Sequence, residues 1–341
     1  MSITPITFDT QDMPWTPPPY TIIGGAERAA TTGVSAVLLN RGARYPRRQI
    51  FNELCKAGFD YIVSLENPDV HYEIDELSTA FPHVKFILLS EKVTLGGQIN
   101  IAALEQRSPL FFVLWNDLHL LYGVTAAKIA ERLVQPLEHH SSAPFGNWFR
   151  RLCTVPVFQN AQFEPLPTVI SPVFRRGHFE TLPYAAAHED AASIYPFDAA
   201  GIYDRQRFLA LGGFDAHITH PQWQLMDFGF RAWLWGEEIR CTHHVHLRFD
   251  GPPPEISPPN NRSFWHFFLK NLLPDVKQAE NNTVYAHLPL KKLARFLLRA
   301  RESPVRSAGQ FFAIRRWVHQ HRNNWKISAE TLINNWDIRE F

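Results

Sequence analysis

The chain has 341 residues, of which 45% are hydrophobic and 20% are charged, a balance typical of a soluble globular protein with ample core material. The formal net charge of +1 gives no global field that would select nucleic acid, so we expect no nucleic-acid partner. Three cysteines, Cys55, Cys153 and Cys241, are far apart; they predict neither a disulfide framework nor a zinc knuckle and favour a reducing, cytoplasmic location. The first residues do not resemble a signal peptide, and no apolar run is long enough to span a bilayer.

Residues 1–32 are rich in Pro and Thr, which predicts an extended, loosely ordered arm. From there to residue 115, short apolar runs alternate with amphipathic segments. We predict strands over 34–41, 60–69, 84–91 and 110–115, and helices over 47–59 and 96–107. This alternation favours an α/β fold with an open, mainly parallel sheet flanked by helices, and such sheets bind ligands at the carboxyl ends of their strands.

The second half of the chain is less regular. We predict a helix over 124–138, short strands and loops over 144–200, and a strand, a helix and a Gly-Gly stop over 197–215. A segment over 226–238 that forms a helix ending at Gly236, and a strand over 239–249, follow. The proline-rich stretch 251–261 then marks a boundary, so we expect an arm (1–32), an α/β domain (33–250) and a C-terminal helical region (251–341).

The C-terminal region is strongly basic. Residues 291–326 contain ten Lys or Arg and one Glu, a local net charge of +9 (10 − 1). Leu290, Leu293, Phe296 and Leu297 fall on one helical stripe beside these cations. Such a helix could lie on an anionic membrane surface; alternatively, it packs its stripe on the α/β domain and leaves the cations in solvent.

Polar residues end three of the predicted strands: Asn40, Glu66 and Asp117. An aspartate after a strand is commonly a turn or capping residue. It is also a ligand that a hard divalent cation prefers, and such a cation bridges a diphosphate well. His119 would lie on the same side of an extended segment as Asp117, where it either adds a ligand or makes a surface hydrogen bond.

Histidines cluster at His243, His244 and His246. In a strand, His244 and His246 share a face, and two imidazoles on one face can bind a transition metal. The alternative is a set of ordinary hydrogen bonds near a pocket.

Two further pairs carry weaker signals. Asp227 and Arg231 lie one helical turn apart in an apolar helix, so they form either a simple ion pair or a positioned functional carboxylate. Gly96 and Gly97 precede a helix and could offer backbone N–H groups to phosphate, although their spacing matches neither G-x-G-x-x-G nor a P-loop.

In this order and spacing, the segments VSAVLLNR, YIVSLENPD, LGGQINIAALEQ and LWNDLHL resemble the family 2 glycosyltransferases of the GT-A fold. The most specific part is AAGIYDRQRFLALGGFD followed by MDFGFRAWLWGEEI, which is similar to the acceptor-side block of that family. The resemblance covers residues 33–250.

The resemblance implies a hexosyltransferase-type enzyme that moves a sugar from a nucleotide-diphosphate sugar to an acceptor hydroxyl, with inversion and with Mn²⁺ or Mg²⁺. It implies that Asp117 is the metal aspartate and that His246 or His244 completes the metal site. The nucleotide and donor contacts that it implies are Asn40, Glu66, Gly97, Asn100 and Asn116. All these side chains are then expected to converge in one cleft around a pyrophosphate.

Two departures from the family pattern bear on activity. Trp115 stands where the first aspartate of the D-x-D metal motif is usual, and Gln224-Leu225 replaces the Glu-Asp pair that supplies the usual base. Leucine cannot accept a proton, so either Asp227 or Asp215 acts as the catalytic base, or the site uses another group, or activity is lost. The alternative function is therefore a catalytically silent relative that binds a nucleotide sugar or glycan; a third is an unrelated nucleotide-binding enzyme such as a nucleotidyltransferase.

The resemblance also implies a glycan or lipid-linked acceptor, as in the synthesis of cell-envelope polysaccharide or glycolipid. We therefore expect a cytoplasmic protein that makes peripheral contact with the anionic inner face of the membrane.

Overall fold

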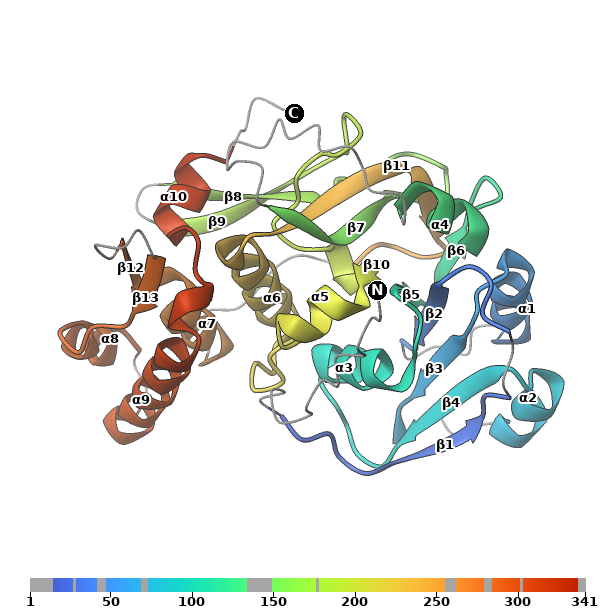
Figure 1. Ribbon diagram of the computed structural model, residues 1–341, viewed down its shortest axis with the longest axis horizontal. Helices are drawn as coiled ribbons and strands as arrows, with labels where there is room; N and C mark the ends of the chain where they lie inside the picture. Colours follow the sequence, from blue (N-terminus) through green and yellow to red (C-terminus); the bar gives the residue numbers. More distant parts are fainter. Residues whose placement is uncertain are drawn as a thin grey trace, which may run out of the picture.

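The structure is a computed structural model that describes residues 15–26, 29–41, 47–68, 73–133, 149–175, 178–254, 262–278, 284–300 and 303–336. A nine-stranded sheet runs through it in the order β1-β4-β3-β2-β5-β10-β7-β11-β6 (Figure 1). Its strands are β1 (Tyr20–Gly24), β2 (Val34–Leu39), β3 (Ile62–Glu66), β4 (Val84–Leu89), β5 (Leu110–Trp115), β6 (Leu118–Leu120), β7 (Arg150–Gln159), β10 (Gly201–Asp204) and β11 (Glu237–Phe249).

The strands β4, β3, β2 and β5 pair in parallel and form the first half of the sheet. Every residue of β2 and β3 is buried, as expected of parallel strands covered on both faces. The helices of this half are α1 (Arg47–Ala57), α2 (Ile74–Ala80), α3 (Leu95–Glu105) and α4 (Ala126–Leu133). The predicted α/β class is confirmed, and the four strands predicted up to residue 115 are β2, β3, β4 and β5.

The predicted N-terminal arm contains a strand. Residues 20–24 form β1, which pairs antiparallel with β4 from Tyr20 opposite Leu89 to Gly24 opposite Lys85. The prediction missed it because the prolines before it suggested a loop, whereas the Thr-Ile-Ile run within it favours a strand. An edge strand leaves N–H and C=O groups unpaired, and β1 satisfies those of β4. Residues 1–14 lie outside the described part of the chain.

The second half of the sheet is mixed. β10 pairs antiparallel with both β5 and β7, and β11 pairs parallel with β7. The remaining elements of this half are the hairpin of β8 (Val169–Arg175) and β9 (His178–Tyr184), the single turn η3 (Phe197–Ala199), and helices α5 (Arg205–Ala210) and α6 (Pro221–Trp235). α6 begins five residues earlier than predicted, with Pro221 in its first turn, and ends as predicted at Gly236, whose φ of 89° suits glycine.

The C-terminal region packs against α6 rather than standing apart (Figure 1). It comprises α7 (Arg262–Phe267), the π-helical turn η4 (Phe268–Leu272), β12 (Asp275–Gln278), β13 (Val284–His287), α8 (Lys292–Ala300), α9 (Pro304–Gln320), η5 (Arg322–Asn324) and α10 (Ala329–Asn334). Trp336 contacts Trp233 of α6 at 5.0 Å between ring centroids and donates a hydrogen bond to Ser171 of β8. A single hydrophobic core therefore runs from the sheet into this region.

No helix in the described residues is both long and apolar enough to cross a membrane.

Gly229 permits the closest approach of α6 to the chain beside it. A Cβ atom there would lie 1.9 Å from the carbonyl oxygen of Ile194. We expect Gly229→Ala to lower the free energy of unfolding by about 1–3 kcal/mol or more, because the backbone must shift. The matched control is Gly309→Ala in α9, where a Cβ would meet nothing within 4 Å; it should stabilise by about 0.5–1 kcal/mol. Urea unfolding measures both, and equal effects would contradict the packing described.

Candidate functional site

Five residues meet at the carboxyl ends of β2 and β5: Arg41, Trp115, Asn116, Asp117 and Asp198, here called the edge cluster. Arg41 lies just after β2. Trp115 is the last residue of β5, and Asn116 and Asp117 follow it directly. The parallel register places Leu39 opposite Trp115, so the two strands end side by side. Asp198 comes from η3, just before β10. The topology thus gathers residues from positions 41, 115–117 and 198.

The Arg41 guanidinium is the centre of this cluster. Its Nε lies 3.2 Å from the Asp117 carboxylate, and its Nη2 donates a hydrogen bond to Asp198. Its Cζ lies 4.0 Å from the centroid of the Trp115 ring, a cation–π contact. The backbone N–H of Arg41 donates to Asn116 Oδ1 at 3.0 Å. The Trp115 ring therefore supports the Arg41 cation.

Asp198 has a strained backbone. Its φ is 54° and that of Ala199 is 59°, a left-handed conformation that costs energy for residues other than glycine. The indole N–H of Trp115 donates to the carbonyl oxygen of Asp198 at 2.8 Å and holds this conformation. Such strain is concentrated at functional sites. The sequence prediction missed Asp198, since a lone aspartate in FDAAG carries no periodic or spacing signal.

Both carboxylates of the edge cluster are hard to ionise. Burial raises the pKa of Asp198 to about 7 despite the neighbouring Arg41 guanidinium. Burial also raises the pKa of Asp117, again against the effect of Arg41. Two carboxylates share one guanidinium, so their net charge when ionised is −1 (1 − 2). In the described part of the chain, the buried Asp117 Oδ1 has no hydrogen-bond partner, and the cluster can accept a further cation or donor.

The predicted metal set of Asp117 with His244 and His246 is not assembled. His246 Nε2 is bonded to the carbonyl of His243, and His244 lines a cavity of about 230 Å³ beside α4. β11 shifts register between Thr242 and His246, so the alternation assumed for its histidines is interrupted. Among the residues that the structure describes, no three His, Cys, Asp or Glu side chains form a group able to hold a metal ion. The carboxylates that remain are Asp117 and Asp198, and both fit a hard cation.

His119, considered above as a further ligand, makes two hydrogen bonds instead. Its Nδ1 lies 3.0 Å from a Glu53 carboxylate oxygen, and its Nε2 lies 2.7 Å from an Asp250 carboxylate oxygen. The hydrogen bond with Glu53 is the main cause that raises the pKa of His119 to about 9. A protonated His119 therefore ties α1 to the residue that follows β11.

Asn40 and Glu66 lie at the predicted strand ends, but both are engaged within the protein. The Asn40 amide donates to the carbonyl of Leu65 at 2.7 Å. Glu66 accepts a hydrogen bond from Ser64 at 2.7 Å and forms an ion pair with Arg47. The Asn40 contact joins the end of β2 to β3, and the ion pair of Glu66 joins the end of β3 to α1.

Gly97 and Asn100 lie in α3, and Asn100 holds the Gly-Gly-Phe-Asp loop, residues 212–215. Asn100 donates to the carbonyl of Phe214 and accepts from its N–H, both at 2.8 Å. The N–H of Gly97 donates to the N-cap residue Thr94, and that of Gly96 donates to Gln224. Neither glycine N–H is left to bind phosphate, so the phosphate site considered at this helix start is not formed.

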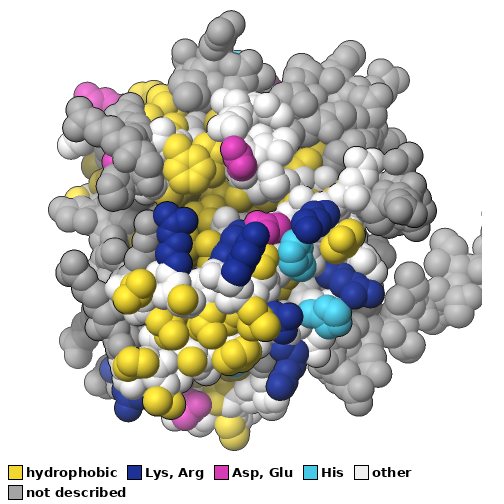
Figure 2. All heavy atoms as spheres, turned by 90° about the vertical axis from the view of Figure 1, so that its left-hand side faces the viewer, with side chains coloured by type: hydrophobic (Ala, Val, Ile, Leu, Met, Phe, Trp, Pro, Cys, Tyr) yellow, Lys and Arg dark blue, Asp and Glu magenta, His cyan; other side chains and the backbone are white. Residues whose placement is uncertain are grey.

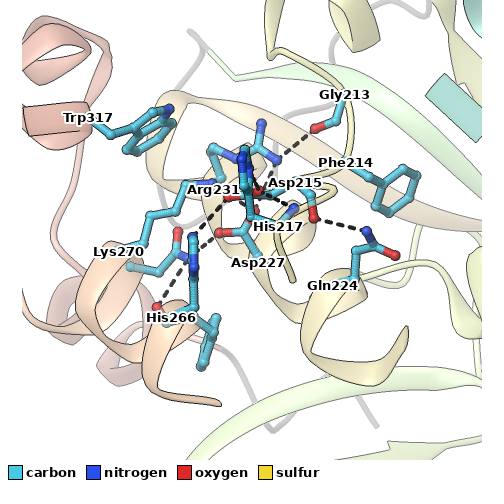
Figure 3. Close-up of polar contacts among 12 residues, drawn as sticks. Gly213, Phe214, Asp215, His217, Gln224, Asp227, Arg231, His266, Lys270 and Trp317 are labelled. Carbon is cyan, nitrogen blue, oxygen red and sulfur yellow. Dashed lines mark hydrogen bonds and ion pairs between the residues drawn. The ribbon is translucent and has the colours of Figure 1, made fainter. Parts of the chain in front are cut away.

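Asp215 and Asp227 belong to a second group, the Lys270 cluster: Asp215, Asp227, Arg231, Lys270 and Asn271 (Figure 3). Lys270 Nζ lies 2.7 Å from Asp215 and 3.2 Å from Asp227. Arg231 Nη2 lies 3.1 Å from Asp227, and Asn271 donates to Asp227 at 2.8 Å. The π-helical turn η4 supplies both Lys270 and Asn271, and its wider winding differs from that of the α-helix before it.

The Lys270 cluster is electrically balanced, with two carboxylates against two cations. Burial would raise the pKa of Asp215, but Lys270 and hydrogen bonds from His217 and His266 outweigh it and hold that pKa well below its usual range. A carboxylate kept ionised in this way is a weak general base. Leu225 is buried, and the adjacent Gln224 is bonded to Gly96, Thr94 and the carbonyl of Asp215. The cluster anchors the C-terminal region to α6.

The predicted site residues therefore lie in several separate groups of contacts. Asn116 and Asp117 are in the edge cluster with Arg41, which the sequence prediction missed; Asp215 and Asp227 are in the Lys270 cluster. Asn100 is bonded to the loop before Asp215. Among the described residues, the hydrogen bonds and ion pairs given above do not join the edge cluster to the Lys270 cluster.

No protein-family profile matches the chain, and no curated protein matches it. Among solved structures, the chain is similar to GalNAc-T7 with UDP, GalNAc and Mn²⁺ (14% identity, TM-score 0.45, 69% of this chain and 48% of that one). It is also similar to S. aureus TarS (11% identity, TM-score 0.46, 87% and 44%) and to TarS 1–349 in complex with UDP-GlcNAc (11%, 0.45, 89% and 78%). The chain thus spans about half the length of the first two structures.

Lys270 should be essential for stability. Lys270→Met leaves Asp215 and Asp227 buried without their shared ammonium, and losing one partner of a buried ion pair typically costs about 3–5 kcal/mol. We expect the free energy of unfolding, measured in urea, to fall by about that amount. The control is Arg48→Met, whose exposed ion pair with Glu76 should contribute less than about 1 kcal/mol. Equal effects of the two variants would show that Lys270 is not an anchor.

His119 should make stability depend on pH. Its pKa is raised from 6.5 to about 9 in the folded chain, so its contribution is complete below the unfolded pKa and is lost as pH rises through the folded one. We expect the difference in unfolding free energy between wild type and His119→Gln to be largest below pH 6.5 and to decline toward pH 9. Urea unfolding across this range measures it, and a difference that grows with pH would refute the assignment.

Proposed function

We propose that the chain is a glycosyltransferase that moves a sugar from a nucleotide-diphosphate sugar to an acceptor hydroxyl. The observation that carries this proposal is the edge cluster. Two carboxylates, whose side chains are 8% and 11% exposed, share one guanidinium at the carboxyl ends of β2 and β5, and Asp117 Oδ1 has no partner in the described part of the chain. Ligands of open α/β sheets bind at this edge, and two carboxylates that share one guanidinium favour a ligand that brings a cation, because the cation would hold both of them ionised.

The chemistry of the edge cluster suits a divalent cation bound together with a diphosphate. Mg²⁺ is usually held by one or two carboxylates plus substrate phosphates, and Asp117 with Asp198 would supply those carboxylates. When bound, Mn²⁺ or Mg²⁺ would neutralise charge on the departing nucleoside diphosphate.

Besides the metal ion, the edge cluster would offer a second cation, the Arg41 guanidinium, which Asn116 and Trp115 position. Asn116 holds the backbone of Arg41, and the Trp115 ring supports its guanidinium. The Arg41 side chain is 26% exposed, so it can present its remaining donors to a phosphate without leaving the ring. Guanidinium forms paired hydrogen bonds with phosphate oxygens, and Asn40 and Glu66 keep the neighbouring strand ends in place.

The acceptor in this proposal is the hydroxyl of a glycan or a lipid-linked sugar, and the reaction inverts the anomeric carbon. The group that takes the acceptor proton is Asp227 or Asp215 if Lys270 moves away from them. The contacts of Lys270 give specific support to a second candidate function: binding of a nucleotide sugar without turnover. A carboxylate that stays paired with an ammonium is a poor proton acceptor.

Nucleotide binding tests the proposed site. We expect a panel of nucleoside diphosphates and their sugars, with Mn²⁺, to include one that raises the melting temperature of the wild-type protein. Asp117→Asn and Asp198→Asn should each weaken that ligand about 10–100-fold, the loss typical of altered metal sites. The control is Asp75→Asn, because Asp75 is exposed on α2. No stabilising nucleotide, or unchanged affinity in both variants, would exclude this site.

Turnover separates the two functions. The assay measures release of nucleoside diphosphate from the bound donor, with and without acceptor glycans. It compares the wild type with the Asp117→Asn, Asp198→Asn and Asp75→Asn variants. Turnover that is lost in Asp117→Asn supports the transferase; tight binding without any turnover supports the silent relative.

A further inference from the structure

Helices α8 and α9 expose large apolar side chains to solvent. Leu298 is 84% exposed and Val305 is 81% exposed, while Leu290 and Phe312 are about half exposed. They are four of the eight large hydrophobic residues that are exposed in the described part of the chain. Isolated exposed apolar residues are common, but such a concentration in one helix pair indicates an interaction surface.

The exposed residues follow the helical repeat. Ala294 and Leu298 are spaced four residues apart in α8, and Leu290 lies just before the helix, four residues ahead of Ala294. Val305, Gly309 and Phe312 repeat along α9, and all six residues are exposed. Residues at this spacing share one face of a helix. We call these six residues the outer face.

The outer face is distinct from the stripe that the sequence predicted. Phe296 is buried and lies 5.7 Å from Trp265 and 6.1 Å from Phe311 between ring centroids. Leu293 and Leu297 are half-buried against the same core. The inner residues already hold α8 on the molecule, so the outer face is not needed for that packing.

Cations border the outer face. Lys291 just before α8, Arg295 on α8, and Arg306 and Arg316 on α9 are exposed. The described residues 284–300 and 303–320 contain no Asp or Glu. Figure 2 shows an apolar patch on this side of the molecule with Lys and Arg side chains along its border.

We propose that the outer face of α8 and α9 binds the surface of an anionic lipid bilayer. Helices lie in the membrane interface when aliphatic and aromatic side chains enter the acyl boundary and cations meet the lipid headgroups. Nucleic acid would use the cations but not Leu298 or Val305, which its phosphates cannot contact favourably. This inference stands on the C-terminal region alone and does not depend on the proposed transferase or on the edge cluster.

Vesicle sedimentation tests the proposal with the full chain. We expect binding to vesicles of phosphatidylcholine and phosphatidylglycerol in equal parts, little binding to phosphatidylcholine alone, and a decrease as salt rises. Leu298→Glu combined with Val305→Glu should weaken binding at least about tenfold, because both side chains lose their favourable burial. Lys291→Glu combined with Arg295→Glu should weaken it about 25-fold or more, because each interfacial cation contributes about fivefold.

Two control variants carry matched changes elsewhere. Phe163→Glu alters an apolar side chain that is 50% exposed in another part of the chain, and Arg107→Glu reverses an exposed cation; both should bind like wild type. Thermal unfolding of every variant is measured alongside, and these exposed changes should leave the melting temperature nearly unchanged.

Three results would overturn the proposal: wild type that does not sediment with anionic vesicles, outer-face variants that bind like the controls, or equal binding to both kinds of vesicle. Binding to double-stranded DNA that depends on Lys291 and Arg295 but not on Leu298 and Val305 would assign the face to nucleic acid instead.

Discussion

The contact of one buried ammonium with two carboxylates organises the second half of this molecule. Lys270 contacts two carboxylates: that of Asp215, which lies in the Gly-Gly-Phe-Asp loop, and that of Asp227, which lies in α6. Asn271 donates a further hydrogen bond to Asp227. A buried charge must be paired, because leaving it alone costs far more than the pair gains. The C-terminal region therefore stays on α6, and the orientation of α8 and α9 follows from this attachment.

The edge cluster and the Lys270 cluster contain the same residue types but differ in charge balance. The Lys270 cluster has two anions and two cations, with most of its hydrogen bonds made within the protein. The edge cluster has two anions, one cation, a carboxylate oxygen without a partner in the described residues, and a strained turn. The Lys270 cluster also has buried atoms without a hydrogen-bond partner in the described residues, Arg231 Nε and Asn271 Oδ1. The two clusters therefore differ in charge balance, and the proposed ligand site rests on the excess of carboxylates at the edge cluster.

Hydrophobic runs predicted much of the fold, because buried parallel strands and glycine-terminated helices depend on local chemistry. β2 to β5 and the end of α6 at Gly236 were predictable for that reason. β1 was not, since its pairing with β4 is a long-range contact preceded by prolines.

In the site, Asp117 and Asn116 were identified from a strand end, but Arg41 and Asp198 were not. Arg41 and Asp198 come into contact only when β2, β5 and η3 pack together, and no sequence spacing predicts that contact. Lys270 was missed because a lysine inside an apolar helical segment looks like a solvated side chain.

The pairing of β1 with β4 also determines how the molecule behaves toward copies of itself. With β1 in place, the backbone groups along that side of β4 are paired, from Tyr20 opposite Leu89 to Gly24 opposite Lys85. If residues 20–24 detach, a row of free amides and carbonyls opens on a strand that is otherwise apolar. The same segment of a neighbouring chain then fits that row equally well, so detachment provides a route to strand-exchanged dimers.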